Sequence, residues 1–242
     1  TALFGLKTKL QFGKLTATAL VSQQQSESKS VSSRGGAQTT KFTVNADQYD
    51  ANRHFFLGHF FRDNYDRFAA RLPHVASGIK ITRIEVWITN KNSNYQQSRN
   101  LVGFMDLGEN KRLANDYWTP NLSFDNPSNK SNNLLDIIKN DYPGARNINT
   151  VTQALAPLEA YGITGGRDYE KVESARLLNS SEYSLNSDLG YISLKSSLNT
   201  DEVLAVAYEY TYNGQVFQVG EFSSDVTSTS DALYLKMLRS TT

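Results

Sequence analysis

Histidine and acidic side chains gather in one short stretch, NRHFFLGHFFRDNYDRF (52–68), where they could bind a metal ion or transfer protons. Two of the chain's three histidines, His54 and His59, lie here, and Arg62, Asp63 and Asp66 follow. The two histidines are five positions apart, which is about 140° around a helix and opposite faces of a strand. Side chains so placed cannot bind one ion from a regular element. We therefore expect a packed aromatic segment rather than a metal site.

The sequence lacks the residue combinations that nucleophilic catalysis needs. The chain contains no cysteine, which excludes thiolate nucleophiles, disulfides and the common zinc patterns. Serine is abundant, but no G-x-S-x-G motif occurs and no serine stands out beside a histidine. The segment GITGGRDYE (162–170) has glycines ahead of a predicted helix, yet it lacks the Lys-Ser/Thr pair of a phosphate loop. A turn followed by a helix cap is the default interpretation, and an anion site at the helix N-terminus is the alternative.

Pairs of acidic residues flank several predicted strands and could form a carboxylate dyad or a calcium site. Such pairs are more often the solvated ends of strands. The pairs are Asp106 with Glu109, Glu170 with Glu173, and Asp201 with Glu202. We accordingly predict a protein that is not an enzyme, with no catalytic residue, no cofactor site and no metal site.

Composition is that of a globular protein with balanced charge. The chain has 242 residues, of which 39% are hydrophobic and 20% are charged, so it can bury a sizeable core. Its formal net charge of +1 gives no electrostatic reason to expect nucleic acid as a partner. The chain begins at Thr1, directly in strand-like sequence and without a signal-peptide pattern. We expect it to be a piece of something longer.

The first 25 residues predict a β-hairpin. Residues Phe4, Leu6, Leu10 and Phe12 share one face and alternate with polar residues and glycine. After the turn at Gly13-Lys14 the alternation restarts through Leu15, Ala17, Ala19 and Val21. Each arm has about the 9–11 residues of a tilted transmembrane strand. The pattern also fits a hairpin of a soluble sheet, so on its own it leaves both interpretations open.

A polar Ser-, Gln- and Gly-rich stretch follows, and we predict a linker over residues 26–40. Beyond it, apolar residues at helical spacing predict one or two helices that end at Pro73. The stripe comprises Leu57, Phe61, Tyr65, Phe68 and Leu72. Two further helices are predicted over 148–161 and 168–178.

Strands dominate the rest of the chain. The segment from Gly78 to Asn90 is β-branched, and its alternation changes phase near Thr82-Arg83, which predicts a β-bulge. Near the C-terminus, Asn213-Gly214 is typical of a two-residue hairpin turn and sets Tyr210 opposite Phe217. Strands are also predicted over 99–109, in SEYSLN and GYISLKS, and in ALYLKMLRS. We predict a mainly β (α+β) fold, a β-sandwich or jelly-roll-like domain over 41–242 with two or three packed helices, preceded by the hairpin of residues 1–25.

Several long stretches in the same order resemble one family. They are ALFGLKTKLQFGKL, ADQYDANRHFFLGHFFRDNYD, ITRIEVWITNK, RNLVGFMDLGE, DYEKVESARLLNSSEYSLNSDLGYISL and DEVLAVAYEYT. The chain resembles the SprA/Sov family, the large outer-membrane protein of the type 9 secretion system, which gliding motility also requires.

The resemblance implies a non-enzymatic piece of a very large outer-membrane β-barrel that exports folded proteins. The hairpin would belong to the barrel wall with Gly13-Lys14 as a periplasmic turn, and the following domain would form part of an extracellular cap. Implied partners are other parts of the same barrel, a PorV-like outer-membrane protein, secreted cargo proteins and the outer membrane, and no nucleic acid. The alternative is a surface carbohydrate-binding or adhesive β-sandwich, for which Trp87, Trp118 and Tyr117 are the candidate aromatic residues.

Overall fold

The computed structural model describes residues 2–13, 15–25, 50–91 and 97–242. The chain divides into two compact units, Thr1–Ala46 and Asp47–Thr242. The predicted linker, residues 26–40, lies outside the described residues. Among the helices of the described ranges, none combines the length and the apolar character needed to cross a membrane.

The first unit contains a long β-hairpin. Strands β1 (Ala2–Phe12) and β2 (Leu15–Gln25) have 11 residues each and pair antiparallel over their whole length, from Ala2↔Gln25 to Phe12↔Leu15. Gly13 follows β1 with a φ of 60°, a left-handed conformation that glycine adopts without steric penalty. The predicted hairpin, with a two-residue connection between Phe12 and Leu15, is therefore confirmed.

In the second unit the main sheet closes on itself. Its order is β10-β9-β11-β5-β6-β4, and β4 also pairs with β9, so β9, β11, β5, β6 and β4 form a ring. Within that ring β5 and β11 run parallel and the other neighbours run antiparallel. The strands are β4 (Ile79–Ile88), β5 (Ser98–Phe104), β6 (Tyr169–Leu177), β9 (Leu204–Tyr212), β10 (Gln215–Val219) and β11 (Leu233–Arg239). The predicted class, mainly β with packed helices, is confirmed, and the closed ring takes the place of two facing sheets.

Small side chains allow the ring to close tightly. A Cβ atom added to Gly103 would lie 3.2 Å from the Cβ of Met237 and 3.7 Å from that of Ala205, so larger residues would force the strands apart. The inner cluster also holds Trp87, Leu101, Val172, Ala175, Leu233 and Leu235. On the outer face a second cluster joins alternate strand residues such as Val206 to the helices. Both faces of the sheet thus carry buried apolar residues.

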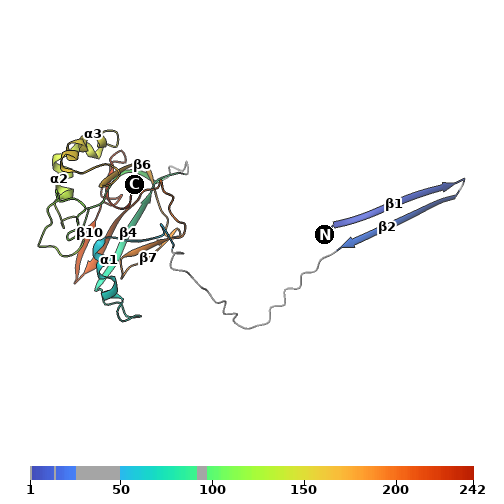
Figure 1. Cartoon of the computed structure of the whole chain (residues 1–242), viewed down its shortest axis with the longest axis horizontal. Coiled ribbons are helices and arrows are strands. Elements are labelled where there is room, and N and C mark those ends of the chain that lie inside the picture. The colour runs from blue at the N-terminus through green and yellow to red at the C-terminus, as the bar shows by residue number, and fades with distance from the viewer. Residues whose placement is uncertain (1, 14, 26–49, 92–96) are drawn as a thin grey trace. The chain divides into compact units, whose positions relative to one another are not determined.

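Within the described residues, three short α-helices cover the outer face. They are α1 (His59–Phe68), α2 (Leu134–Asp141) and α3 (Val151–Leu155), accompanied by the 3₁₀ helices η1 (Pro143–Arg146) and η2 (Ala156–Tyr161). In Figure 1, α2 and α3 lie next to each other at one side of the folded unit, away from α1. The helix predicted over 148–161 is present as α3 and η2, whereas α2 was not predicted.

The first predicted helix begins later than its apolar stripe. Residues His54–Phe56 form strand β3, which pairs with β8, and the helix starts at His59. Leu57, Phe61 and Phe68 are buried as predicted. Leu72, the last residue of the stripe, is 64% exposed and lies beyond the helix.

The helix predicted over 168–178 is wrong, because Tyr169–Leu177 forms strand β6. Val172 and Ala175 are both buried although they are three positions apart, a spacing typical of a helix. A bulge explains this spacing: the pairing of β5 with β6 shifts between Arg99 and Leu101, and Ser174 has a φ of 50°. The extra residue turns both apolar side chains to the same face.

The other predicted strands are present, although the one predicted over 99–109 ends at Phe104 and residues 105–108 form turns. The pairing of β4 with β9 shifts between Ile81 and Arg83, at the predicted bulge. Asn213 and Gly214 both have positive φ, and Tyr210 lies opposite Phe217. A separate three-stranded sheet has the order β3-β8-β7, with β7 (Tyr183–Asn186) and β8 (Tyr191–Leu194) forming the predicted pair.

Candidate binding cleft

The two histidines of the opening segment have separate partners. His54 lies in β3, where its Nδ1 is 2.8 Å from the hydroxyl of Ser193 and its Nε2 is 3.5 Å from a carboxylate oxygen of Asp50. His59 begins α1, and its backbone N–H donates to Oε1 of Glu109 at 3.0 Å. Within the described ranges no group of three or more His, Asp or Glu residues is placed to hold a metal ion. The segment instead builds one wall of a cleft.

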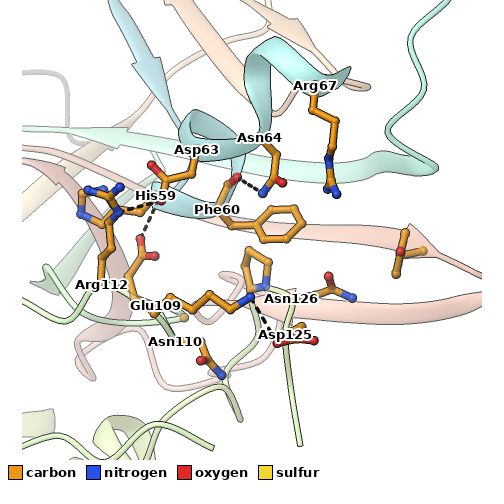
Figure 2. Close-up of a pocket in the computed structure, with 14 residues that line it drawn as sticks. His59, Phe60, Asp63, Asn64, Arg67, Glu109, Asn110, Arg112, Asp125 and Asn126 are labelled. Carbon is orange, nitrogen blue, oxygen red and sulfur yellow. Dashed lines mark hydrogen bonds and ion pairs between the residues drawn. The ribbon is translucent and has the colours of Figure 1, made fainter. Parts of the chain in front are cut away.

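This cleft lies between α1 and the turns that follow β5, and Figure 2 shows its lining. Its volume is about 290 Å³. Side chains of α1 face those of two loops across the cavity. Its polar and charged lining consists of His59, Asp63, Asn64, Arg67, Glu109, Asn110, Lys111, Arg112, Asp125 and Asn126.

At the floor, Glu109 forms a buried ion pair with Lys236. Their side chains are each 4% exposed, and Nζ of Lys236 lies 2.8 Å from Oε1 of Glu109. The lysine also donates to the carbonyl of Met105. Because the same carboxylate oxygen accepts the N–H of His59 at the start of α1, the pair joins that helix to β11. Removing a single partner would leave an uncompensated buried charge.

Asp106 is also buried, 3% exposed, and the interpretation of Asp106 and Glu109 as solvated strand ends is wrong. The Asp106 carboxylate accepts the backbone N–H groups of Ala114 at 2.7 Å and Asn115 at 3.1 Å. Burial raises the pKa of Asp106, although these two hydrogen bonds and the charge of Lys236 oppose the change. The segment after β5 folds back over the Asp106 carboxylate. No local sequence pattern indicates this arrangement.

Ion pairs line the mouth of the cleft. Nε of Arg112 lies 2.7 Å from a carboxylate oxygen of Asp63, and Nζ of Lys111 lies 3.4 Å from one of Asp125. Arg67 lies over the ring of Phe68, with its guanidinium carbon 5.0 Å from the ring centroid. Charged groups held in pairs suit the binding of a polar partner better than proton transfer, which needs a group of adjusted pKa facing a substrate.

A second charged cluster surrounds Glu221, which is 5% exposed. Arg146 donates two hydrogen bonds to its carboxylate, at 2.6 and 3.0 Å, and Nζ of Lys139 lies at 2.8 Å. The backbone N–H of Tyr234 adds a fourth contact at 2.9 Å. Burial raises the pKa of Glu221, but the bonds from Arg146, Lys139 and Tyr234 outweigh it and lower the pKa overall. The contributing residues are too far apart in the sequence to form a motif.

The remaining predicted acidic pairs do not form carboxylate dyads. Glu170 accepts from Thr241, whereas Glu173 pairs with Lys171 at 3.4 Å. Asp201 pairs with Lys91, and Glu202 accepts the N–H of Asn199 at 2.7 Å. The anion site considered at 162–170 is also wrong, because a strand follows those glycines and there is no helix N-terminus.

Aromatic residues expected for sugar binding lie mostly in the core. Trp87 is 1% exposed and Trp118 is 3% exposed, so neither can offer a face to a ligand. Tyr117 is half-buried and packs against Tyr161, with ring centroids 4.4 Å apart. The three residues therefore do not form the exposed platform that the carbohydrate-binding alternative requires.

Comparison with known proteins gives one positive result. No curated protein matches the chain. A family model described as motility related/secretion protein matches residues 1–208. This match covers the hairpin and most of the second unit and ends within β9. The chain therefore belongs to the SprA/Sov family of motility- and secretion-related proteins.

Proposed function

We propose that this chain is a non-enzymatic part of a large outer-membrane protein-export channel, the translocon of the type 9 secretion system that also serves gliding motility. Its hairpin contributes two strands to the wall of the channel, and its second unit belongs to an extracellular cap. The observation that carries the proposal is the unbroken hairpin of two 11-residue strands in a chain of a secretion family.

Strand length supports a membrane role for the hairpin. Strands rise about 3.3 Å per residue, so 11 residues extend for about 36 Å. Tilted by about 45°, they cover the apolar band of an outer-membrane barrel, which is about 25 Å tall. The alternation of Phe4, Leu6, Leu10 and Phe12 with polar residues and glycine is the period-2 pattern of strands that face lipid on one side.

Topology within the proposed channel follows from the lengths of the connections. Outer-membrane barrels have short periplasmic turns and place long insertions outside the cell. Only Gly13 and Lys14 separate β1 from β2, whereas the second unit follows β2. The second unit is therefore assigned to the cell surface, where the cleft beside α1 is available to a PorV-like partner or to exported cargo.

Single cysteines test this topology, because the chain has no cysteine of its own. Leu122 is 89% exposed on a loop of the second unit, so Leu122→Cys in the intact protein should react with a membrane-impermeant maleimide on whole cells. Lys14→Cys, in the short turn, should react only after the outer membrane is permeabilised. Labelling of Lys14→Cys on intact cells would contradict the proposal. Labelling of Leu122→Cys only in permeabilised cells would place the second unit on the other side.

The main alternative is a soluble surface adhesin. In that case the hairpin would lie in water, and both cysteines would react equally on intact cells. The burial of Trp87 and Trp118 also removes two of the three residues on which a sugar-binding role was based.

A further inference from the structure

Among the described strands, β3 lies at one edge of the three-stranded sheet, whose order is β3-β8-β7. It pairs antiparallel with β8, with His54 opposite Ser193 and Phe56 opposite Tyr191. The flanking bonds run from the N–H of Leu194 to the carbonyl of Arg53 and from the N–H of Leu57 to the carbonyl of Gly190. Residues 53, 55 and 57 therefore direct their backbone groups toward β8, because alternate residues of an antiparallel strand bond to the same neighbour. The N–H and C=O groups of His54 and Phe56 point to the opposite side.

Two cavities lie along this strand, and all three of its residues line both. One has a volume of about 200 Å³ and is also lined by Tyr65 and Tyr191. The other, also about 200 Å³, is walled by apolar residues that include Met105, Met237 and Leu238. A cavity of about 150 Å³ can hold a benzene ring, so each of the two can hold one apolar or aromatic side chain.

Charge around the second cavity is uneven. Lys236 and Glu109, which both contribute to its wall, neutralise each other at 2.8 Å. Arg62 also lines this cavity and is exposed to solvent. An apolar interior with a cationic rim complements a segment that has apolar residues and an acidic residue beside them.

From these observations we infer that β3 is a docking edge for an extended polypeptide, which adds as a strand antiparallel or parallel to it. The backbone of the added strand bonds to His54 and Phe56. Successive side chains of a strand point to opposite faces, so neighbouring apolar residues enter the two cavities and a carboxylate pairs with Arg62. Main-chain hydrogen bonds would supply much of the affinity, and the cavities the specificity. The test of this site is independent of the proposed membrane role, because binding is measured with the purified chain in solution.

The probe is an acetylated and amidated peptide, Thr-Glu-Val-Phe-Val-Thr, carrying a fluorescent label. Binding to the purified 242-residue chain is followed by fluorescence polarisation. Methylation of backbone nitrogens at alternate positions of the peptide removes the donors of one edge only. One set of positions should weaken binding by about 3- to 10-fold per bond lost, and the other set should have no effect. An equal response to both sets, or no binding of the peptide, would overturn the inference.

A proline substitution tests the receiving edge. His54→Pro removes an N–H that faces away from β8, so the fold should persist, since proline is tolerated in edge strands. Peptide binding should fall by about 3- to 10-fold or more, while the unfolding temperature falls only slightly, because the exposed hydrogen bond between His54 and Ser193 is lost. Phe55→Pro, the matched control, removes an N–H directed at β8 and should lower the unfolding temperature. If His54→Pro fails to fold, the methylated peptides on the unmodified chain decide the question.

Charge reversal identifies the rim contact. Arg62→Glu should weaken binding of the glutamate peptide, and replacing that glutamate with lysine should restore it. Pairing of two copies of this chain through β3 is the competing outcome. Such pairing would appear as concentration-dependent dimerisation that His54→Pro abolishes. That result would overturn the inference that a different polypeptide binds to β3.

Discussion

At the residue scale, Glu221 shows how burial and charge oppose each other. The side chain of this acid is 7% exposed, yet Arg146 and Lys139 lie within 3 Å of its carboxylate. Arg146 also lies over the ring of Tyr234, 3.8 Å from the centroid, and burial raises the pKa of that tyrosine to about 12. The cluster ties η1 and α2 to the connection between β10 and β11.

The lowered pKa of Glu221 predicts a pH dependence of stability. Because its pKa in the folded state lies below the ordinary value of 4.5, ionised Glu221 stabilises the fold above that pH. The contribution is lost as pH falls through the folded-state pKa. Glu221→Gln should lower the free energy of unfolding by about 1.5–3 kcal/mol at pH 7 and should flatten its decline below pH 4.5. Urea unfolding midpoints measured across this pH range check both effects, and an unchanged acid slope would contradict the assignment.

Buried apolar residues can be predicted from the sequence, whereas buried charged residues such as Glu221 cannot. Leu57 and Phe61 could be assigned to the core from their spacing and type, and both are 0% exposed. The sequence favours solvated positions for Asp106 and Glu109, because carboxylates rarely lie in a core. Their burial depends on Lys236, Ala114 and Asn132, which chain folding brings to them from other segments.

At the element scale, turn chemistry was the most reliable predictor. Asn213 and Gly214 have φ values of 49° and 75°, as a two-residue turn with matching twist requires. A Cβ atom added to Gly214 would contact nothing within 4 Å, so its replacement tests backbone conformation alone.

Gly214→Val should therefore destabilise the fold by about 1–3 kcal/mol, the range for a β-branched residue held at positive φ. Gly214→Asn is the matched control and should lose much less, because asparagine tolerates the left-handed region. Thermal unfolding of the two variants gives the comparison. Equal losses would mean that a β-branched side chain adds no strain at this φ beyond that of asparagine.

Bulges explain both the success and the failure of strand prediction. In β4 the change of phase at Thr82-Arg83 was visible because apolar β-branched residues mark both halves. In β6 the bulge at Ser174 brings Val172 and Ala175 to one face, and the resulting spacing imitates a helix. Whether such a segment forms a helix or a bulged strand depends on a pairing partner such as β5. The sequence of the segment alone does not reveal that partner.

At the scale of the whole molecule, the closed ring of strands could not be derived from the sequence. Closure requires β4 to pair with β9 along its length and with β6 at Trp87 and Ile88, contacts between distant segments. The same limit applies to the cleft beside α1, which four separate segments build. The hairpin of the first unit was predictable because both of its strands and its turn are contiguous.

The proposed membrane role of that hairpin predicts a dependence on depth. Leu6 pairs with Val21 near the middle of the strands, whereas Leu10 pairs with Ala17 closer to the turn. On a lipid-facing surface an arginine costs about 2–4 kcal/mol at the bilayer midplane and about 0–1 near its edges. Leu6→Arg should therefore reduce the amount of assembled channel and the export of cargo more than Leu10→Arg does. Lys7→Glu, on the opposite face by alternation, is the matched control and should change neither. In a hairpin exposed to water, Leu6→Arg and Leu10→Arg would have the same small effect, so equal export by both variants would contradict a place in the barrel wall.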